Sequence, residues 1–167
     1  MKRENKQWIT ISLLFLSICI GFGSCFPFPD YEKEQEELIR KFVTKNADYD
    51  FQAKESGIYY CEHVTGTGKS PVANDTVSIR YYSYLLKGSQ LDTIFPVDQD
   101  PVDYILGYGS LVQGVDEAIT YMKPGGRSWV IVPSYLGYGN YTYYHDPYTP
   151  LLFYIELVDV RYYNPEK

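Results

Sequence analysis

The spacing of hydrophobic and polar positions divides the chain into stretches of different character. Residues 8–22 form an uncharged apolar run, and Pro27 and Pro29 follow it in a short segment typical of a stiff tether. From Tyr31 to Asn46, hydrophobic side chains recur at helical spacing while Glu and Lys occupy the other face. The recurring positions are Leu38, Ile39, Phe42 and Val43. This pattern predicts an amphipathic helix that packs on the following domain or acts as a spacer.

Beyond about residue 50 the pattern becomes that of strands. Segments rich in β-branched and aromatic residues alternate with turn sequences that contain glycine. The predicted strands are 57–64, 76–86, a short one at 91–92, 102–106, 127–132 and 151–160. One short helix is expected at 112–122, with Val115, Ile119 and Met122 on one face and a proline and two glycines ending it. Several strands with one central helix predict an α+β domain built on an antiparallel sheet.

The first 25 residues have the layout of a targeting segment. Three basic residues come first, the apolar run follows, and small residues precede Cys25. The run is shorter than the about 20 apolar residues that a membrane helix needs. The segment resembles a bacterial lipoprotein signal, which implies cleavage after Ser24 and a lipid on Cys25, although Phe22 stands where such signals usually have Leu. Ordinary secretion is the alternative.

Composition narrows the classes of function. The net charge is −6, and it becomes −8 once residues 1–24 are removed, so the acidic balance argues against nucleic acid as a partner. Cys61 would be the single free thiol of the mature chain, and a small buried hydrophobe is its expected role. With two histidines in all, no metal-ligand spacing and no nucleophile motif, we expect neither a metal nor a cofactor.

Seven short motifs occur in a set order between Gly57 and Tyr162. They are V-S-I-R-Y (77–81), L-x-G-x-x-L-D (86–92), I-L-G (105–107), L-V-Q-G-V-D-E-A-I (111–119), M-K-P-G-G-R (122–127), V-P-S-Y-L-G-Y-G (132–139) and P-L-L-F-Y-I-E-L (150–157). In this order they resemble the FKBP family of peptidyl-prolyl cis-trans isomerases. The resemblance implies a bent antiparallel sheet wrapped around one short helix, with the ligand groove between them. The implied division is a signal peptide at 1–24, a tether and amphipathic helix at 25–50, and an FKBP-like domain at 51–167.

Catalysis of prolyl isomerisation requires an apolar pocket with a few hydrogen-bond donors. Rotation about an amide costs about 18–20 kcal/mol because conjugation must be broken. A dry, aromatic-lined site favours the twisted amide over the planar, hydrated one, and one or two donors then fix the direction of its carbonyl. The resemblance implies catalytic roles for Tyr81, Asp92 and Tyr138. The substrate-binding residues that it implies are Leu91, Val102, Leu111, Val112 (through its backbone N–H), Val115, His145 and Phe153.

Some pocket positions depart from the family pattern. Leu91 stands where Phe is expected, Val115 where Trp is expected, and His145 near an expected apolar residue. The aromatic residue expected near Val102 is absent, although Tyr104 follows two residues later. These changes would make the pocket wider and wetter.

Plain structural roles remain open for single residues of the set. Tyr81 can be one of many strand tyrosines, Asp92 can cap a turn, and Phe153 can belong to the core. His145, beside Tyr143 and Tyr144, can tune binding with pH, but a solvated loop histidine is the favoured interpretation.

The leading prediction is a lipid-anchored isomerase that assists the folding of exported polypeptides in the bacterial cell envelope, on the periplasmic side or at the outer membrane. Its expected partners are proline-containing polypeptide clients, its contact with membranes is through the N-terminal lipid alone, and the chain is expected to be a monomer. The alternative is a catalytically weak or inactive FKBP-like binding or chaperone module. A third interpretation is a structural lipoprotein that uses its tyrosine-rich surface for assembly.

Overall fold

A single antiparallel sheet and two α-helices make up the part of the chain that the computed structural model describes. That part is residues 30–87, 90–93 (backbone alone), 100–141 and 146–166. The helices are α2 (Tyr31–Lys45), α3 (Gln113–Tyr121) and the short 3-10 turn η1 (Ser134–Leu136). The strands are β1 (Gln52–Ala53), β2 (Tyr59–Val64), β3 (Thr76–Lys87), β4 (Gln90–Thr93), β5 (Val102–Ile105), β6 (Arg127–Val132) and β7 (Leu151–Arg161).

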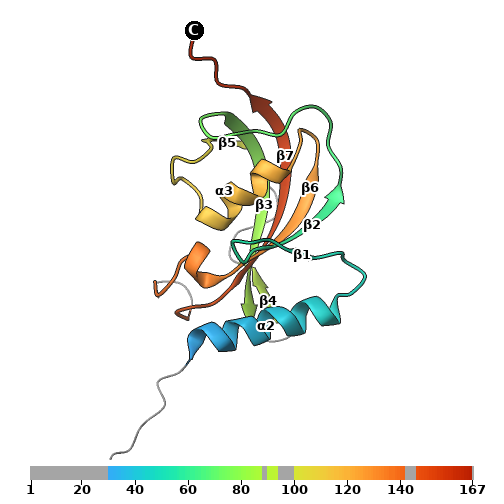
Figure 1. The fold of residues 1–167 in the computed structure, drawn as a ribbon, viewed down its shortest axis with the longest axis vertical. Helices are drawn as coiled ribbons and strands as arrows, with labels where there is room; N and C mark the ends of the chain where they lie inside the picture. Colours follow the sequence, from blue (N-terminus) through green and yellow to red (C-terminus); the bar gives the residue numbers. More distant parts are fainter. Residues whose placement is uncertain (1–29, 88–89, 94–99, 142–145, 167) are drawn as a thin grey trace, which may run out of the picture. The chain divides into compact units, whose positions relative to one another are not determined.

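The long strand β3 organises the sheet (Figure 1). The strand order is β1-β2-β6-β7-β3-β4, with β5 pairing β3 as well. On one side β3 pairs with β7 along most of its length, while on the other side its first half pairs with β5 and its last residues with β4. The predicted α+β class, the antiparallel sheet and the single central helix are all confirmed.

The inner face of the sheet carries the main core, and α3 lies across it (Figure 1). Helix residues Val115, Ala118 and Ile119 are buried against side chains of β3, β6 and β7. Gly114 makes this packing possible, because a Cβ there would lie 2.6 Å from Val132 Cγ1. A glycine at the helix start therefore lets α3 approach β6 more closely than any other residue would.

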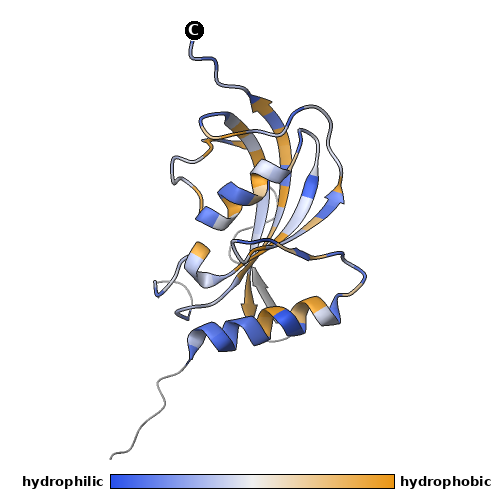
Figure 2. Cartoon of the chain, viewed as in Figure 1, coloured by the Kyte–Doolittle hydropathy of each residue, from blue (hydrophilic) through white to orange (hydrophobic). Residues whose placement is uncertain are grey.

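The opposite, outer face is partly covered by α2. Ile39, with 3% of its surface exposed, packs on Leu86, Ile131 and Leu152, and Phe42 and Val43 extend the contact. Hydrophobic and hydrophilic segments accordingly alternate along this helix (Figure 2). The predicted helix over 31–46 is confirmed to within a residue, and it packs on the sheet as one compact unit, Tyr31–Lys167.

The expectations for a signal peptide and for lipid on Cys25 lie outside the described residues. Within residues 30–166 as described, no helix is both long and apolar enough to cross a membrane. Cys61 is buried, as its sequence context predicts.

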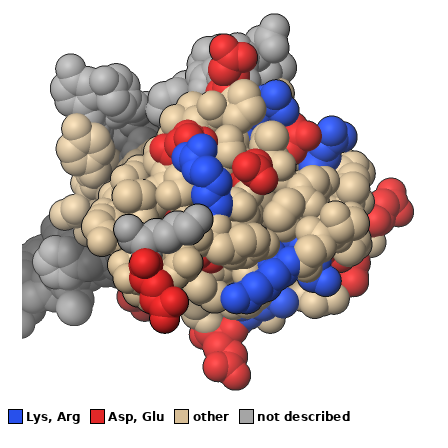
Figure 3. Space-filling view, turned by 90° about the horizontal axis from the view of Figure 1, so that it is seen from above, with Lys and Arg blue, Asp and Glu red and all other residues tan. Residues whose placement is uncertain are grey.

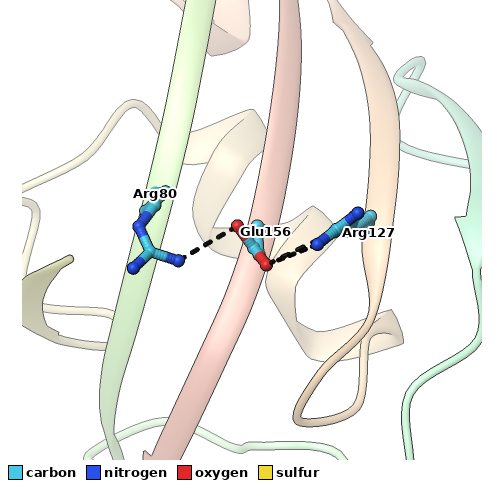
Figure 4. A network of polar contacts seen from close by, with 3 residues as sticks. All are labelled: Arg80, Arg127 and Glu156. Carbon is cyan, nitrogen blue, oxygen red and sulfur yellow. Dashed lines mark hydrogen bonds and ion pairs between the residues drawn. The ribbon is translucent and has the colours of Figure 1, made fainter. Parts of the chain in front are cut away.

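Beyond the end of α2, the outer face carries two rows of side chains that cross the strands. One is aromatic, where Trp129 and Tyr154 have ring centroids 4.6 Å apart. The next is charged: Glu156 on β7 accepts hydrogen bonds from Arg80 on β3 and Arg127 on β6 (Figure 4). Elsewhere, on the face seen in Figure 3, positive and negative side chains are interspersed, with no extended basic patch of the kind that binds nucleic acid.

Candidate active site

Tyr81 lies on the inner face of β3, at the edge of the main core. It is half-buried, and its ring centroid lies 6.1 Å from that of Phe153 on the neighbouring β7, at an interplanar angle of 48°. Phe153 itself has only 4% of its surface exposed. The alternation of side chains along antiparallel strands puts the two rings on one face, so the predicted catalytic Tyr81 and the predicted substrate-binding Phe153 meet.

Tyr104 on β5 is the second aromatic partner of Tyr81. Its side chain is hydrogen-bonded to that of Tyr81, and it packs against the main core. Val102 lies two residues earlier on the same strand, so it faces the same way, but it is 40% exposed and sits at the rim. In the sequence, Tyr104 stands out only as a neighbour of Val102. The register of β5 pairs Tyr104 with Val77, and its hydroxyl reaches that of Tyr81 further along β3.

The phenols of this cluster stay protonated far above neutral pH. Burial above all, together with the hydrogen bond with Tyr104 and the nearby Tyr138, raises the pKa of Tyr81 to about 12. Burial also raises the pKa of Tyr138. Both hydroxyls are therefore neutral under physiological conditions, in which form a tyrosine can donate a hydrogen bond.

Tyr138 is carried by the segment between β6 and β7. This segment begins with η1, and the carbonyl of Ser134 accepts hydrogen bonds from the N–H groups of Gly137 (3.0 Å) and Gly139 (2.8 Å). Gly139 has a φ of 59°, a left-handed conformation that glycine adopts without strain. The tight turn leaves Tyr138 with 36% of its surface exposed, beside the Tyr81 cluster.

The start of α3 supplies the apolar side of the cluster. Leu111 and Val112 are half-buried against the main core, and Val115 on the first helical turn is 1% exposed. Val112 is the N-cap, in an extended conformation, and its carbonyl accepts the N–H of Val115 at 2.9 Å. A donor role for the N–H of Val112 remains a prediction.

Asp116 ties the same helix end to the preceding loop. Burial raises the pKa of the Asp116 carboxyl, while a hydrogen bond with the backbone of Gly107 partly offsets that rise. Since Gly107 directly follows the buried Leu106 at the end of β5, this contact links α3 to the strand that carries Tyr104.

The structure thus brings six predicted site residues into one neighbourhood on the inner face. They are Tyr81, Leu111, Val112, Val115, Tyr138 and Phe153. For Leu91 and Asp92 the backbone of β4 alone is described, in register with Leu86 and Leu85 of β3. The side chains of those two residues, and the whole of His145, lie outside the described residues.

The described site residues form a half-buried aromatic and aliphatic surface, with neutral tyrosine hydroxyls at its edge. Within the described part of the chain, no three His, Cys, Asp or Glu side chains are grouped as metal ligands. Such a surface can desolvate a peptide segment and orient one of its carbonyls, which are the two demands of amide rotation.

Comparison with known proteins shows which family this chain belongs to. The family model for FKBP-type peptidyl-prolyl cis-trans isomerase matches residues 67–158, more than half of the chain. The chain belongs to the FKBP-type peptidyl-prolyl cis-trans isomerase family. That membership makes it an isomerase by class, and it confirms the resemblance drawn from the seven motifs.

Individual relatives agree with the family assignment. The chain is 33% identical over 105 residues to the peptidyl-prolyl cis-trans isomerase Mip of Coxiella burnetii, covering 62% of this chain and 44% of that protein. It is 32% identical over 97 residues to an FK506-binding protein of Neisseria meningitidis serogroup B, covering 57% of this chain and 88% of the relative. The FKBP chain therefore spans less than half of the first relative and most of the second.

Solved FKBP structures have the same fold. A peptidyl-prolyl cis-trans isomerase from Pseudomonas syringae pv. tomato superposes with a TM-score of 0.65 at 28% identity, covering 83% of this chain and 98% of that one. FkpA from Escherichia coli gives the same TM-score at 22% identity, covering 96% of this chain and 73% of its own. The predicted FKBP-like fold is confirmed.

Proposed function

We propose that this FKBP catalyses cis–trans isomerisation of X–Pro bonds in exported polypeptides of the bacterial cell envelope. The observation that carries the proposal is the cluster of Tyr81, Tyr138 and Phe153 on the inner face, where both phenols are neutral. Names of relatives that are themselves peptidyl-prolyl cis-trans isomerases support the reaction type.

The proposed chemistry is desolvation followed by orientation of a carbonyl. The prolyl ring would rest on the apolar floor formed by Val115 and Phe153, away from water. A planar amide loses its hydration there, whereas the twisted amide, which has less charge separation, loses less. A hydrogen bond from Tyr138 to the substrate carbonyl would hold the carbonyl in place while the C–N bond rotates. In this proposal Asp92 and the N–H of Val112 complete the polar set.

The envelope location rests on the sequence of residues 1–25. Its basic start, apolar run and small residues before Cys25 support a lipoprotein signal. In our proposal lipid on Cys25 tethers the isomerase to a membrane, and residues 26–30 separate the lipid from α2. The clients are then unfolded or extended polypeptides that pass through the same compartment.

A binding module with little turnover is the second candidate, and a specific observation favours it. The floor residue Val115 is a small side chain with 1% exposure, and the rim residue Val102 is aliphatic and exposed. Large apolar side chains in a pocket contribute about 1.5–3 kcal/mol each when fully buried, so this floor holds a prolyl ring less strongly than an aromatic one.

A kinetic assay separates the two candidates. Protease-coupled isomerisation of a tetrapeptide series, varied at the residue before Pro, should show acceleration by the wild-type chain. Tyr138→Phe and Asp92→Val should each lower kcat/KM by about 10-fold or more, which corresponds to a loss of about 1.4 kcal/mol of transition-state stabilisation. Tyr163→Phe, which alters a tyrosine that is 63% exposed, is the matched control and should leave the rate unchanged.

The possible outcomes lead to different conclusions. Acceleration that both site variants retain would refute these residue assignments while leaving the enzyme in place. No acceleration by well-folded chain, together with peptide binding, would establish the binding module instead.

A further inference from the structure

Helix α2, which lies outside the family-matched residues 67–158, makes two contacts with the segment that carries Tyr138. The side-chain Oε1 of Gln35 accepts a hydrogen bond from the backbone N–H of Ser134 at 2.9 Å. The ring of Tyr31 stacks on that of Tyr148, with centroids 4.3 Å apart and planes 25° from parallel. The first two turns of α2 thus hold the segment at a point before Tyr138 and at a point after it.

Burial makes the Gln35 contact specific. Gln35 is 5% exposed, an unusual state for glutamine, and Ser134 is 2% exposed. A buried backbone N–H requires an acceptor, and the helix side chain is the one that Ser134 has. If the acceptor were removed, the segment would have to move to satisfy this N–H elsewhere.

Backbone hydrogen bonds connect both contacts of α2 to the turn that carries Tyr138. The carbonyl of Ser134 accepts the N–H of Gly139 at 2.8 Å, and the carbonyl of Gly139 accepts the N–H of Tyr148 at 2.8 Å. Each residue that α2 holds is therefore one backbone hydrogen bond from Gly139, which is the neighbour of Tyr138. A shift at either point is passed to the turn on which the Tyr138 side chain stands.

Other contacts of the segment do not involve the helix. Leu86 N–H donates to the carbonyl of Pro150 at 2.9 Å, and Lys87 forms a 3.2 Å ion pair with Asp146. These bonds attach the far end of the segment to β3. At the η1 end, the Tyr135 hydroxyl donates to the carbonyl of Ser56 at 3.1 Å and Leu136 packs in the main core, while Gln35 is the acceptor for the N–H of Ser134.

We propose that Gln35 and Tyr31 are positioning residues for the isomerase reaction, which α2 supports by fixing the turn that carries Tyr138. The proposal rests on the proposed function, in which the Tyr138 hydroxyl orients the substrate carbonyl. Because catalytic geometry is sensitive to displacements of about 1 Å, loosening this turn lowers turnover more than it lowers stability. The isomerase unit of this chain therefore includes α2, and it is larger than the family domain alone.

Paired substitutions at Gln35 in the full chain test this inference. Gln35→Met keeps the length of the side chain but removes the acceptor, whereas Gln35→Glu keeps an oxygen in its place. Ile39→Val is the matched control, since Ile39 is buried one turn further along the same helix but faces Leu86, Ile131 and Leu152. Gln35→Met should lower kcat by about 3- to 10-fold with little change in KM, Gln35→Glu should recover most of that loss, and Ile39→Val should leave kcat unchanged.

Amide hydrogen exchange gives a second measurement that does not depend on activity. In Gln35→Met the amides of Ser134, Gly139 and Tyr148 should exchange at least several-fold faster than in the wild type, while amides of β6 and β7 keep their protection. Tyr31→Ala, a change at a residue that is 38% exposed and so compatible with folding, should produce the same pattern centred on Tyr148.

Each outcome bears on a distinct part of the inference. Unchanged exchange at Ser134 and Gly139, or a kcat for Gln35→Met equal to that of Ile39→Val, would overturn the positioning role. If the wild type isomerises no peptide, the proposed function fails and the catalytic role of α2 fails with it. The exchange data would still report whether the helix holds the segment.

Discussion

At the scale of single residues, Tyr104 shows how one hydroxyl can define the state of its neighbour. A phenylalanine in its place would fill the same space against the core, but Tyr104 adds a hydrogen bond to Tyr81. Burial and this bond together keep the Tyr81 proton in place up to about pH 12. Tyr104, which no sequence motif marks as a site residue, therefore helps to set the pKa of Tyr81.

Tyr104→Phe should lower the pKa of Tyr81 from about 12 while leaving it above 10.0, because burial remains. We expect kcat/KM to fall by about 3- to 5-fold, as for the loss of one net hydrogen bond of about 1 kcal/mol. The pKa can be followed from the ring-carbon NMR shift of Tyr81 against pH, with Tyr163→Phe as the control. An unchanged Tyr81 titration would show that the hydroxyl of Tyr104 has no such influence.

The sign of the matching stability effect follows from linkage. The pKa of Tyr81 is higher in the folded chain than in the unfolded one, so the unfolded chain releases its proton first. The contribution of Tyr81 to stability is full below pH 10 and is lost as the pH rises towards 12. In Tyr104→Phe this loss should be complete at a lower pH.

At the scale of elements, the sequence predicts nearly all of the sheet and both helices. Apolar, β-branched and aromatic runs mark β2, β3, β6 and β7 because these strands contribute many buried side chains, and helical spacing marks α2 and α3 because each helix buries one face. Strand β1 was missed, since two exposed residues carry no pattern. Which elements contact one another is harder to predict. The register of β5 on β3 depends on residues far from β5 in the sequence, and Gln35 and Ser134, which form a hydrogen bond, are 99 residues apart.

The charged row of Arg80, Glu156 and Arg127 on the outer face connects strands β3, β7 and β6, and we expect it to stabilise the fold. Burial alone would raise the pKa of the Glu156 carboxyl, but hydrogen bonds from Arg127 and Arg80 lower it below its ordinary value (Figure 4). Glu156→Gln should lower the free energy of unfolding by about 0.5–1 kcal/mol at pH 7, the upper range for partly exposed pairs. Chemical denaturation measures this difference.

The pH dependence of that difference identifies its cause. A lowered folded-state pKa contributes stability above the ordinary value of 4.5, and this contribution is lost as the pH falls through the folded-state pKa. The gap between wild type and Glu156→Gln should therefore close in acid. Glu37→Gln, which breaks the exposed pair with Lys41, is the control with no expected effect. An equal loss in both variants would argue against the network.

At the scale of the whole molecule, the family domain, α2 and the N-terminal segment have different roles in the proposal. The domain supplies the aromatic site, and α2 packs on the outer face and reaches the Tyr138 turn. We propose that residues 1–25 direct the chain to a membrane. The site itself was predicted only through motif order, since single residues such as Tyr81 and Phe153 are also ordinary core and strand residues.

Cys25→Ser tests the proposed anchor without altering the domain. In bacterial cells the wild-type chain should incorporate a fatty acid and sediment with membranes, because two or more acyl chains give stable anchoring. The variant should lose the label and the sedimentation. Membrane association that persists in Cys25→Ser would show that something other than lipid on this residue holds the chain.

The most direct test of the central claim is exchange NMR on one proline-containing peptide in the presence of the folded chain. The account predicts cis–trans exchange peaks that grow with catalytic amounts of protein, together with shifts of the ring resonances of Tyr81, Tyr138 and Phe153. Ring shifts without faster exchange would contradict the isomerase and leave a binding module. Faster exchange with those rings unperturbed would contradict the site.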